Sequence, residues 1–123
     1  MKKNQTVLIV DGAGRGAALV EAYGKSKYVK TIIATPGNDL MIKNTNKKVV
    51  IYPDIKTTNV EKIIEVCKRE KVTFVDVAQE DGVEAGVADA TLALGVPTIG
   101  LTKHAGQLEW DKAWSRQFMW KYK

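Results

Sequence analysis

Short apolar runs alternate with amphipathic stretches along the first hundred residues, and this alternation limits the possible folds more than any other feature. The first run, residues 7–10 (VLIV), has the continuous apolar character of a strand that is buried on both faces. It leads into the glycine-rich turn 11–16 and then into residues 17–23, which have a helical apolar face and end before Gly24. A strand that passes through such a turn into a helix is typical of the start of a βαβ unit.

The same order of elements recurs along the chain. Further strands are predicted at 31–34, 49–51, 74–78 and 96–100, and amphipathic helices at 60–67 and 83–94. The helix at 60–67 can be capped by Thr57, Thr58 or Asn59, whereas the polar stretch before the third strand carries no predicted element. The economical fold is an α/β one: an open, mostly parallel, Rossmann-like sheet with helices on both faces and right-handed crossovers.

Residues 102–123 differ in character from the rest of the chain. A helix is expected after Asp111, and aromatic side chains recur along it at helical spacing. We therefore divide the chain into an α/β domain, residues 1–101, and a helical tail, residues 102–123. The aromatic residues of this tail either close the core or offer a surface to a partner domain or subunit: Trp110, Trp114, Phe118 and Trp120.

The counts of cysteine, histidine and charged residues exclude several classes of function. With one cysteine (Cys67) and one histidine (His104), the chain can form neither an internal disulfide nor a Cys/His metal cluster. The 19 basic residues are dispersed among 14 acidic ones, so the net charge of +5 permits attraction to phosphate but does not indicate nucleic-acid binding. The apolar run at 7–10 is too short to target or anchor the chain, so no membrane partner and a cytoplasmic location are expected.

Ligands of open α/β sheets bind outside the carboxyl ends of the strands, so the loops there are the candidate binding elements. In the first of these loops, Gly12, Gly14 and Gly16 allow close approach to the backbone. The N–H groups at the start of the following helix favour an anion, to which Arg15 can add a charge-assisted contact. The loop therefore predicts a phosphate site, with a tight strand-to-helix turn as the alternative.

Two more loops follow predicted strands. The second strand ends in a sharp turn at Pro36, Gly37 and Asn38. The loop at 79–82 contains two carboxylates, of which Glu80 can accept hydrogen bonds from sugar hydroxyls or an amine. Alternatively, Glu80 or Asp81 caps the helix that begins near residue 83, and one carboxylate can serve each role.

Two common nucleotide-binding loops do not fit the first glycine-rich turn. The glycine spacing is G-x-G-x-G instead of G-x-G-x-x-G, and Pro36-Gly37-Asn38 stands where an acidic ribose-binding residue is expected, so NAD is a minor option. Gly16 is followed by Ala17-Ala18 and not by lysine, which excludes a Walker A loop for ATP.

Several short motifs occur together and in register with these predicted elements. They are VLIVDGAGR at 7–15, ATPGN at 34–38, Glu80 with GVAD at 86–89, GVPTIGLTK at 95–103, QLE at 107–109, DKA at 111–113 and FM at 118–119. In this combination the chain resembles the N-terminal domain of the phosphoribosylamine-glycine ligase family, in the ATP-grasp superfamily. Gly16 and Ala17 stand where that family usually has Glu and His, and Gln79 stands where it has Pro.

The resemblance implies a pre-ATP-grasp fold and a part in an ATP-dependent, ADP-forming ligase that joins glycine to 5-phosphoribosylamine in purine (IMP) biosynthesis. It implies that this domain binds the phosphoribosylamine, or a similar sugar phosphate, through Gly12, Gly14, Arg15, Gly16, Pro36, Gly37, Asn38 and Glu80. ATP and Mg²⁺ are expected in a separate ATP-grasp domain or subunit, so we expect no cofactor, metal or catalytic residue on this chain.

Phosphoryl transfer needs metal-binding carboxylates and phosphate-clamping Lys or Arg around a closed pocket, so the chain alone is not expected to be catalytic. Two alternatives remain open at this point: a free-standing module that binds a sugar phosphate or nucleotide, and a structural remnant that binds neither.

Overall fold

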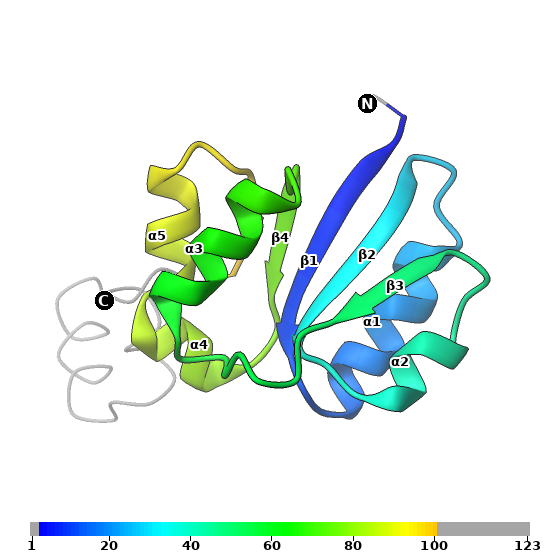
Figure 1. Cartoon of the computed structure of the whole chain (residues 1–123), viewed down its shortest axis with the longest axis horizontal. Coiled ribbons are helices and arrows are strands. Elements are labelled where there is room, and N and C mark those ends of the chain that lie inside the picture. Colours follow the sequence, from blue (N-terminus) through cyan, green and yellow to red (C-terminus); the bar gives the residue numbers. More distant parts are fainter. Residues whose placement is uncertain (1–2, 101–123) are drawn as a thin grey trace, which may run out of the picture.

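The computed structural model describes residues 3–100, which form one sheet flanked by helices (Figure 1). The strands are β1 (Gln5–Asp11), β2 (Val29–Pro36), β3 (Lys48–Ile51), β4 (Phe74–Val77) and β5 (Thr98–Ile99). The helices are α1 (Gly14–Gly24), α2 (Asp39–Lys43), α3 (Val60–Arg69), α4 (Glu80–Ala85) and α5 (Val87–Ala93). The strand order is β3-β2-β1-β4-β5 and every pairing is parallel, which confirms the predicted α/β sheet.

The central strand is β1, which pairs with β2 on one side and with β4 on the other. Its apolar residues are almost fully buried, because each face of the sheet is covered by a separate hydrophobic cluster. Leu8 and Val10 point to the face covered by α3 and α5, whereas Val7 and Ile9 point to the face covered by α1 and α2. This double burial is the reason for the continuous apolar run in the sequence.

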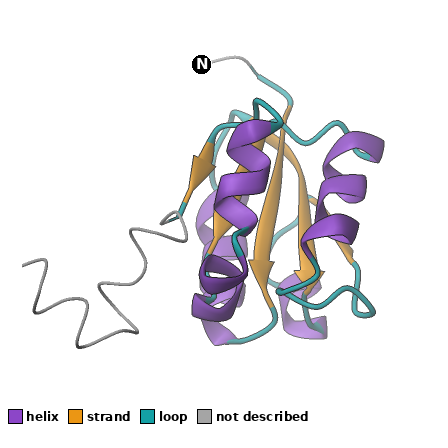
Figure 2. Cartoon of the chain, turned by 90° about the vertical axis from the view of Figure 1, so that its left-hand side faces the viewer, coloured by secondary structure: helices purple, strands orange, loops and turns teal. Residues whose placement is uncertain are grey.

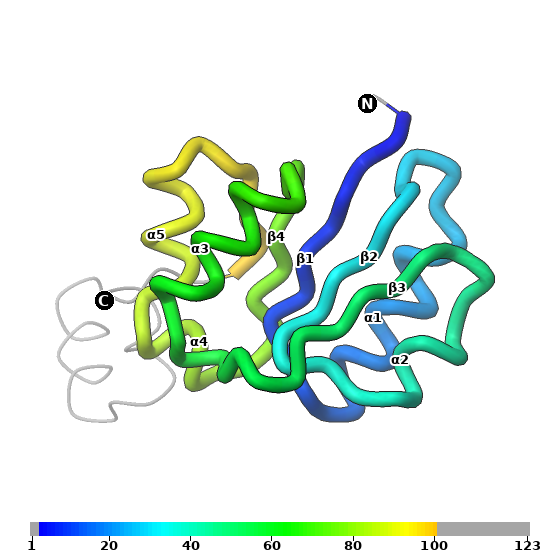
Figure 3. Tube along the Cα trace, in the orientation of Figure 1, coloured from blue at the N-terminus to red at the C-terminus, as the bar shows by residue number. Residues whose placement is uncertain are grey.

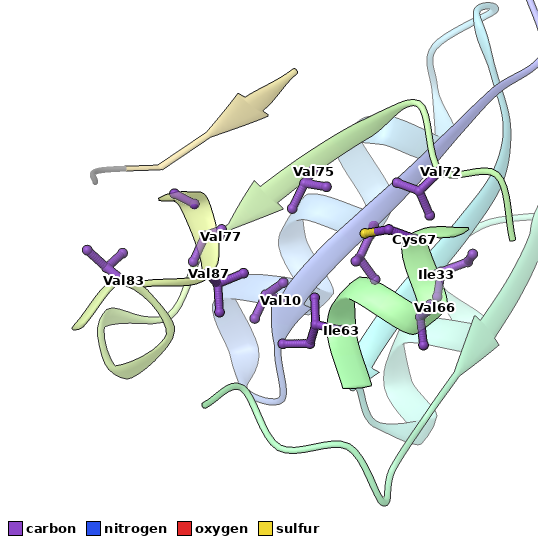
Figure 4. Close-up of a cluster of buried hydrophobic side chains, with 12 residues drawn as sticks. Val10, Ile33, Ile63, Val66, Cys67, Val72, Val75, Val77, Val83 and Val87 are labelled. Atoms are coloured by element: carbon purple, nitrogen blue, oxygen red, sulfur yellow. The ribbon is translucent and has the colours of Figure 1, made fainter. Parts of the chain in front are cut away.

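The helices form two layers, as Figure 2 shows from the side of α3 and α5. In the first layer, Ala17 and Val20 of α1 and Met41 of α2 pack on the sheet. In the second layer, Ile63 and Cys67 of α3 join the valines of the strands (Figure 4). The side chain of Asn59 accepts a hydrogen bond from the N–H of Lys62 and caps α3, one of the three caps predicted for this helix.

The structure corrects three details of the predicted elements. The single helix predicted at 83–94 is two helices, α4 and α5, because Gly86 adopts a left-handed conformation with φ of 88° and ends the first. The polar stretch after the second strand contains a short helix, α2, capped by the side chain of Asn38. Helix α1 begins at Gly14, three residues before the predicted start at Ala17.

The predicted helical tail, with its four candidate partner-binding aromatic residues, lies outside the described residues, and the boundary near residue 101 stays a prediction. Among residues 3–100, no helix is long and apolar enough to cross a membrane.

Candidate functional site

The loops that follow β1, β2 and β4 meet at one end of the sheet, because parallel strands all end at the same edge (Figure 3). Hydrogen bonds join these loops directly. The Gly37 N–H donates to the Asp11 carbonyl over 3.1 Å, and the Asn38 side-chain amide donates to the Gly12 carbonyl over 3.2 Å. The Ala78 N–H donates to the Val10 carbonyl over 3.3 Å. The structure therefore brings together the three loops that the sequence singled out.

The N-terminus of α1 is partly occupied by a side chain of the same loop. The Asp11 carboxylate is 2% exposed and accepts a hydrogen bond from the N–H of Gly16. The N-cap residue, Ala13, provides no side-chain cap, and the N–H groups of Gly14 and Arg15 have no hydrogen-bond partner within residues 3–100. These two N–H groups, and not that of Gly16, are the ones open to an anion.

Gly16 has a packing role that its position in the glycine-rich loop does not reveal. A Cβ at this residue would lie 2.6 Å from the Asp11 Oδ2 atom and 2.6 Å from the Met41 Cε atom. The absence of a side chain therefore lets α1 approach both the end of β1 and α2. Gly14 differs, because a Cβ there would meet no atom within 4 Å.

Arg15 and Glu80 line the same pocket, which has a volume of about 300 Å³. The Arg15 guanidinium reaches from α1 to the third loop, where Nη1 donates to the Ala78 carbonyl over 2.8 Å. A guanidinium has five N–H donors, so this contact orients the group and leaves further donors for a ligand. Glu80 is the first residue of α4 and is exposed. The other residues around the pocket are Val77, Ala78, Gln79, Val83 and Gly100.

The second loop is built into the structure and does not line this pocket. Pro36 follows a cis peptide bond and lies against Gly12, where a Cβ would approach the Pro36 Cγ atom to 2.8 Å. Gly37 has φ of 72° and packs on Ile51. Asn38 binds Gly12 and caps α2. The structure thus separates Arg15 and Glu80, which face the pocket, from Gly12, Pro36, Gly37 and Asn38, which contact one another.

Gln79, which the sequence analysis noted as a departure from the family's usual Pro but not as a binding residue, lines the pocket and makes two side-chain hydrogen bonds. Its Oε1 atom accepts a hydrogen bond from the Gly12 N–H over 3.3 Å, and its Nε2 atom donates to Oδ2 of Asp81 over 3.3 Å. The prediction that Glu80 or Asp81 caps the following helix is wrong. Helix α4 begins at Glu80 without a side-chain cap, and Asp81 instead accepts a hydrogen bond from the Thr57 hydroxyl over 2.8 Å.

Two titratable groups with a raised pKa, the half-buried Tyr23 and the buried Cys67, lie away from the pocket. Burial, with a 2.7 Å hydrogen bond to Asp76, raises the pKa of Tyr23 well above its ordinary value. Burial also raises the pKa of Cys67, to about 11, so this thiol stays protonated and unreactive near neutral pH. No group of three or more His, Cys, Asp or Glu side chains in the described part of the chain is placed to hold a metal ion.

This arrangement defines a parallel α/β domain with a candidate anion site at the ends of its strands. A similar fold occurs in the biotin carboxylase domain of the 2-oxoglutarate carboxylase from Hydrogenobacter thermophilus, solved with MgADP, ADP and bicarbonate. The TM-score is 0.68 and the sequence identity 18%, over 98% of this chain and 28% of that chain. At this identity the similarity concerns the fold alone.

The sequence matches the family model described as "Phosphoribosylglycinamide synthetase, N domain" over residues 5–109, and the chain belongs to this family. It is 36% identical over 119 residues to the phosphoribosylamine-glycine ligase of Methanosarcina barkeri, covering 94% of this chain and 26% of that protein. It is 38% identical over 116 residues to the ligase of Pyrococcus furiosus, covering 92% of this chain and 25% of that protein. The chain therefore spans about a quarter of these relatives, and the resemblance noted from its motifs is confirmed.

Proposed function

We propose that this chain is the part of a phosphoribosylamine-glycine ligase that binds the phosphosugar amine, the acceptor in an ATP-dependent condensation with glycine in purine biosynthesis. The observation that carries this proposal is the pocket that Glu80 and Arg15, the second residue of α1, both line. A cation and helix N–H groups at one side of a pocket favour a phosphate. A carboxylate at the same pocket favours an amine or sugar hydroxyls.

The contacts suggest how such a ligand would be oriented. The phosphate would accept hydrogen bonds from the N–H groups of Gly14 and Arg15 and from the Arg15 guanidinium. Its sugar or amine would then extend toward Glu80, the other charged residue around the pocket. The Ala78 carbonyl fixes one edge of the guanidinium, so less side-chain entropy is lost when the ligand binds.

ATP and Mg²⁺ belong to the proposal for the complete ligase, in which they would supply the activation of glycine. The described residues offer no cluster of acidic side chains that fits a metal ion. In this proposal the nucleotide and metal are held by an ATP-grasp domain or subunit, which contacts the aromatic residues at 110, 114, 118 and 120. The chain alone binds the phosphosugar in the cytoplasm and does not catalyse the reaction.

Ribose 5-phosphate is a suitable calorimetric probe, because it keeps the phosphate and sugar of the proposed substrate. Arg15→Ala removes a charged donor and is expected to weaken binding by roughly 10- to 100-fold, the range for a lost charge-assisted hydrogen bond. The matched control is Lys68→Ala, which removes the same charge from an exposed position on α3. The absence of heat with the unsubstituted chain, or an equal loss in both variants, would contradict the proposed site.

A second experiment separates a ligase part from a free-standing sugar-phosphate binding module, which the presence of a pocket within this chain also favours. The chain is mixed with the remaining domains of a related ligase, and glycine-dependent release of ADP is measured. Restored activity supports the ligase assignment. Ribose 5-phosphate binding without restored activity in a folded mixture favours the binding module.

A further inference from the structure

The side chain of Gln79 connects two loops that surround the pocket. It accepts a hydrogen bond from the backbone of Gly12, in the loop after β1, and donates one to Asp81, in the first turn of α4. Asp81 is held in turn by the hydroxyl of Thr57, a residue that is 5% exposed and precedes α3. We refer to the two hydrogen bonds of the Gln79 side chain as the Gln79 clasp.

The chemistry of its neighbours fixes the orientation of this amide. The Gly12 N–H can be satisfied only by an oxygen, and the Asp81 carboxylate only by a donor, so a flipped amide would lose both hydrogen bonds. The carbonyl of Gly12 is bound as well, by the side-chain amide of Asn38. The N–H and the carbonyl of Gly12 are thus both hydrogen-bonded, and Arg15 follows three residues later. The position of Gly12 therefore determines where α1 begins and where the Arg15 guanidinium lies.

We propose that Gln79 is a positioning residue: the clasp keeps the loop after β1 at the distance from α4 at which Arg15 and Glu80 line one pocket. The hydrogen bonds exist without a ligand, and only their consequence for binding rests on the proposed function. Leucine has a similar size but can make neither hydrogen bond. Glutamate keeps the acceptor for Gly12 but replaces the donor to Asp81 by a second carboxyl group.

The first experiment tests the clasp without any ligand. The hydrogen-exchange rate of the Gly12 amide is measured by NMR in the unsubstituted chain, in Gln79→Leu and in the control Glu84→Gln, an exposed position on α4, the helix that follows Gln79. Gln79→Leu should speed exchange at Gly12 about fivefold, the factor that corresponds to one net hydrogen bond. Glu84→Gln should leave it unchanged. Unchanged exchange at Gly12 in a folded Gln79→Leu variant would overturn the clasp.

The second experiment measures the dissociation constant of ribose 5-phosphate against pH. Gln79→Leu should weaken binding about fivefold at every pH, because ligand binding must then order the Gly12 loop without one net hydrogen bond. Gln79→Glu should bind almost normally at low pH, where the new carboxyl group is protonated and can donate to Asp81, and progressively less well as the new carboxyl group ionises. The other charged groups around the pocket, Arg15 and Glu80, are common to all variants. The ratio of each variant to the unsubstituted chain therefore removes the contributions common to all variants. The exchange rate of the Gly12 amide in Gln79→Glu relative to the unsubstituted chain, measured without ligand over the same pH range, separates a loosened loop from direct repulsion between the new carboxylate and the phosphate.

The outcomes distinguish the hold of Gln79 on the Gly12 loop from its effect on ligand binding. Faster exchange at Gly12 together with a pH-dependent ratio for Gln79→Glu supports the positioning role. A flat ratio for Gln79→Glu, or full affinity in Gln79→Leu despite faster exchange, would overturn it. If the unsubstituted chain does not bind ribose 5-phosphate, the proposed function fails, and the exchange rate at Gly12 still decides whether the clasp holds the loop.

Discussion

Gly14 and Gly16, both in the first turn of α1, are expected to respond in opposite ways to the same substitution. In Gly16→Ala the new Cβ would lie 2.6 Å from an Asp11 oxygen and 2.6 Å from the Met41 methyl group, about 0.8 Å closer than an ordinary contact. The Asp11 oxygen cannot retreat without losing the hydrogen bond from the N–H of residue 16. In Gly14→Ala the Cβ would meet no atom within 4 Å.

The expected free energies follow from these contacts. Overpacking at residue 16 costs about 1–3 kcal/mol, and weakening the Asp11 cap costs about 1 kcal/mol more. Replacing a helical glycine by alanine by itself raises the free energy of unfolding by roughly 0.5–1 kcal/mol at either position. Gly16→Ala should therefore lower the free energy of unfolding by about 1–3 kcal/mol, whereas Gly14→Ala should leave it unchanged or raise it by up to about 1 kcal/mol.

Urea unfolding followed by circular dichroism measures both variants against the unsubstituted chain. Both substitutions add one methyl group to the first turn of α1, so each serves as the control for the other. Equal stabilities, within about 0.5 kcal/mol, would refute the inference that the close approach of α1 to Asp11 requires a glycine at residue 16.

Three other side chains lead to further predictions. Thr35 is fully buried and its hydroxyl has no hydrogen-bond partner in residues 3–100, so Thr35→Val should raise the free energy of unfolding by about 1 kcal/mol; a loss of stability in urea would contradict this. Tyr23→Phe removes the hydrogen-bond donor of the buried Asp76 carboxylate and should lower the free energy of unfolding by about 1–3 kcal/mol. In a double-mutant cycle the same substitution should have a smaller effect when Asp76 has already been replaced by Asn. Burial disfavours the thiolate and raises the pKa of Cys67 to about 11. A thiol reagent at pH 8 should therefore label the protein only after unfolding. Rapid labelling of the native chain would count against the burial of Cys67.

The parts of the fold that rest on local pattern could be predicted from the sequence. The apolar run at 7–10 indicated a strand buried on both faces, and β1 is that strand. The glycine-rich turn after it indicated a strand-to-helix connection, and α1 follows directly. The sequence also singled out the loops after the strands as candidate binding elements, and parallel topology alone places such loops at one edge of the sheet.

Two features of the helices could not be predicted in this way, because the spacing of apolar residues carries no information about backbone conformation. Val83 and Val87 keep helical spacing and are both buried, although the left-handed Gly86 between them ends one helix before the next begins. Helix α2 has five residues, too few for a period, and its signal was the cap at Asn38 followed by Asp39.

The contacts within the site could not be predicted from the sequence, because they join loops that are far apart along the chain. Gln79 meets Gly12 across 67 residues, and no local pattern marks such a pair. Arg15 was predicted as an anion ligand from its loop, but its hydrogen bond to the Ala78 carbonyl depends on how α1 lies against β4. Ligand binding by the predicted site residues stays a prediction.

The central place of β1 has a consequence for the order in which the chain can be assembled. β1 is synthesised before the other strands, and once residue 51 has been added, both its pairing with β2 and the pairing of β2 with β3 can form. Its other edge stays unpaired until β4 arrives, since Thr6 bonds to Thr73 across 67 residues. Until then a strand whose apolar residues are all buried in the complete fold has an open edge, which is the kind of surface that recruits other chains. A chain interrupted between β3 and β4 would thus have half of a sheet and a strong tendency to aggregate.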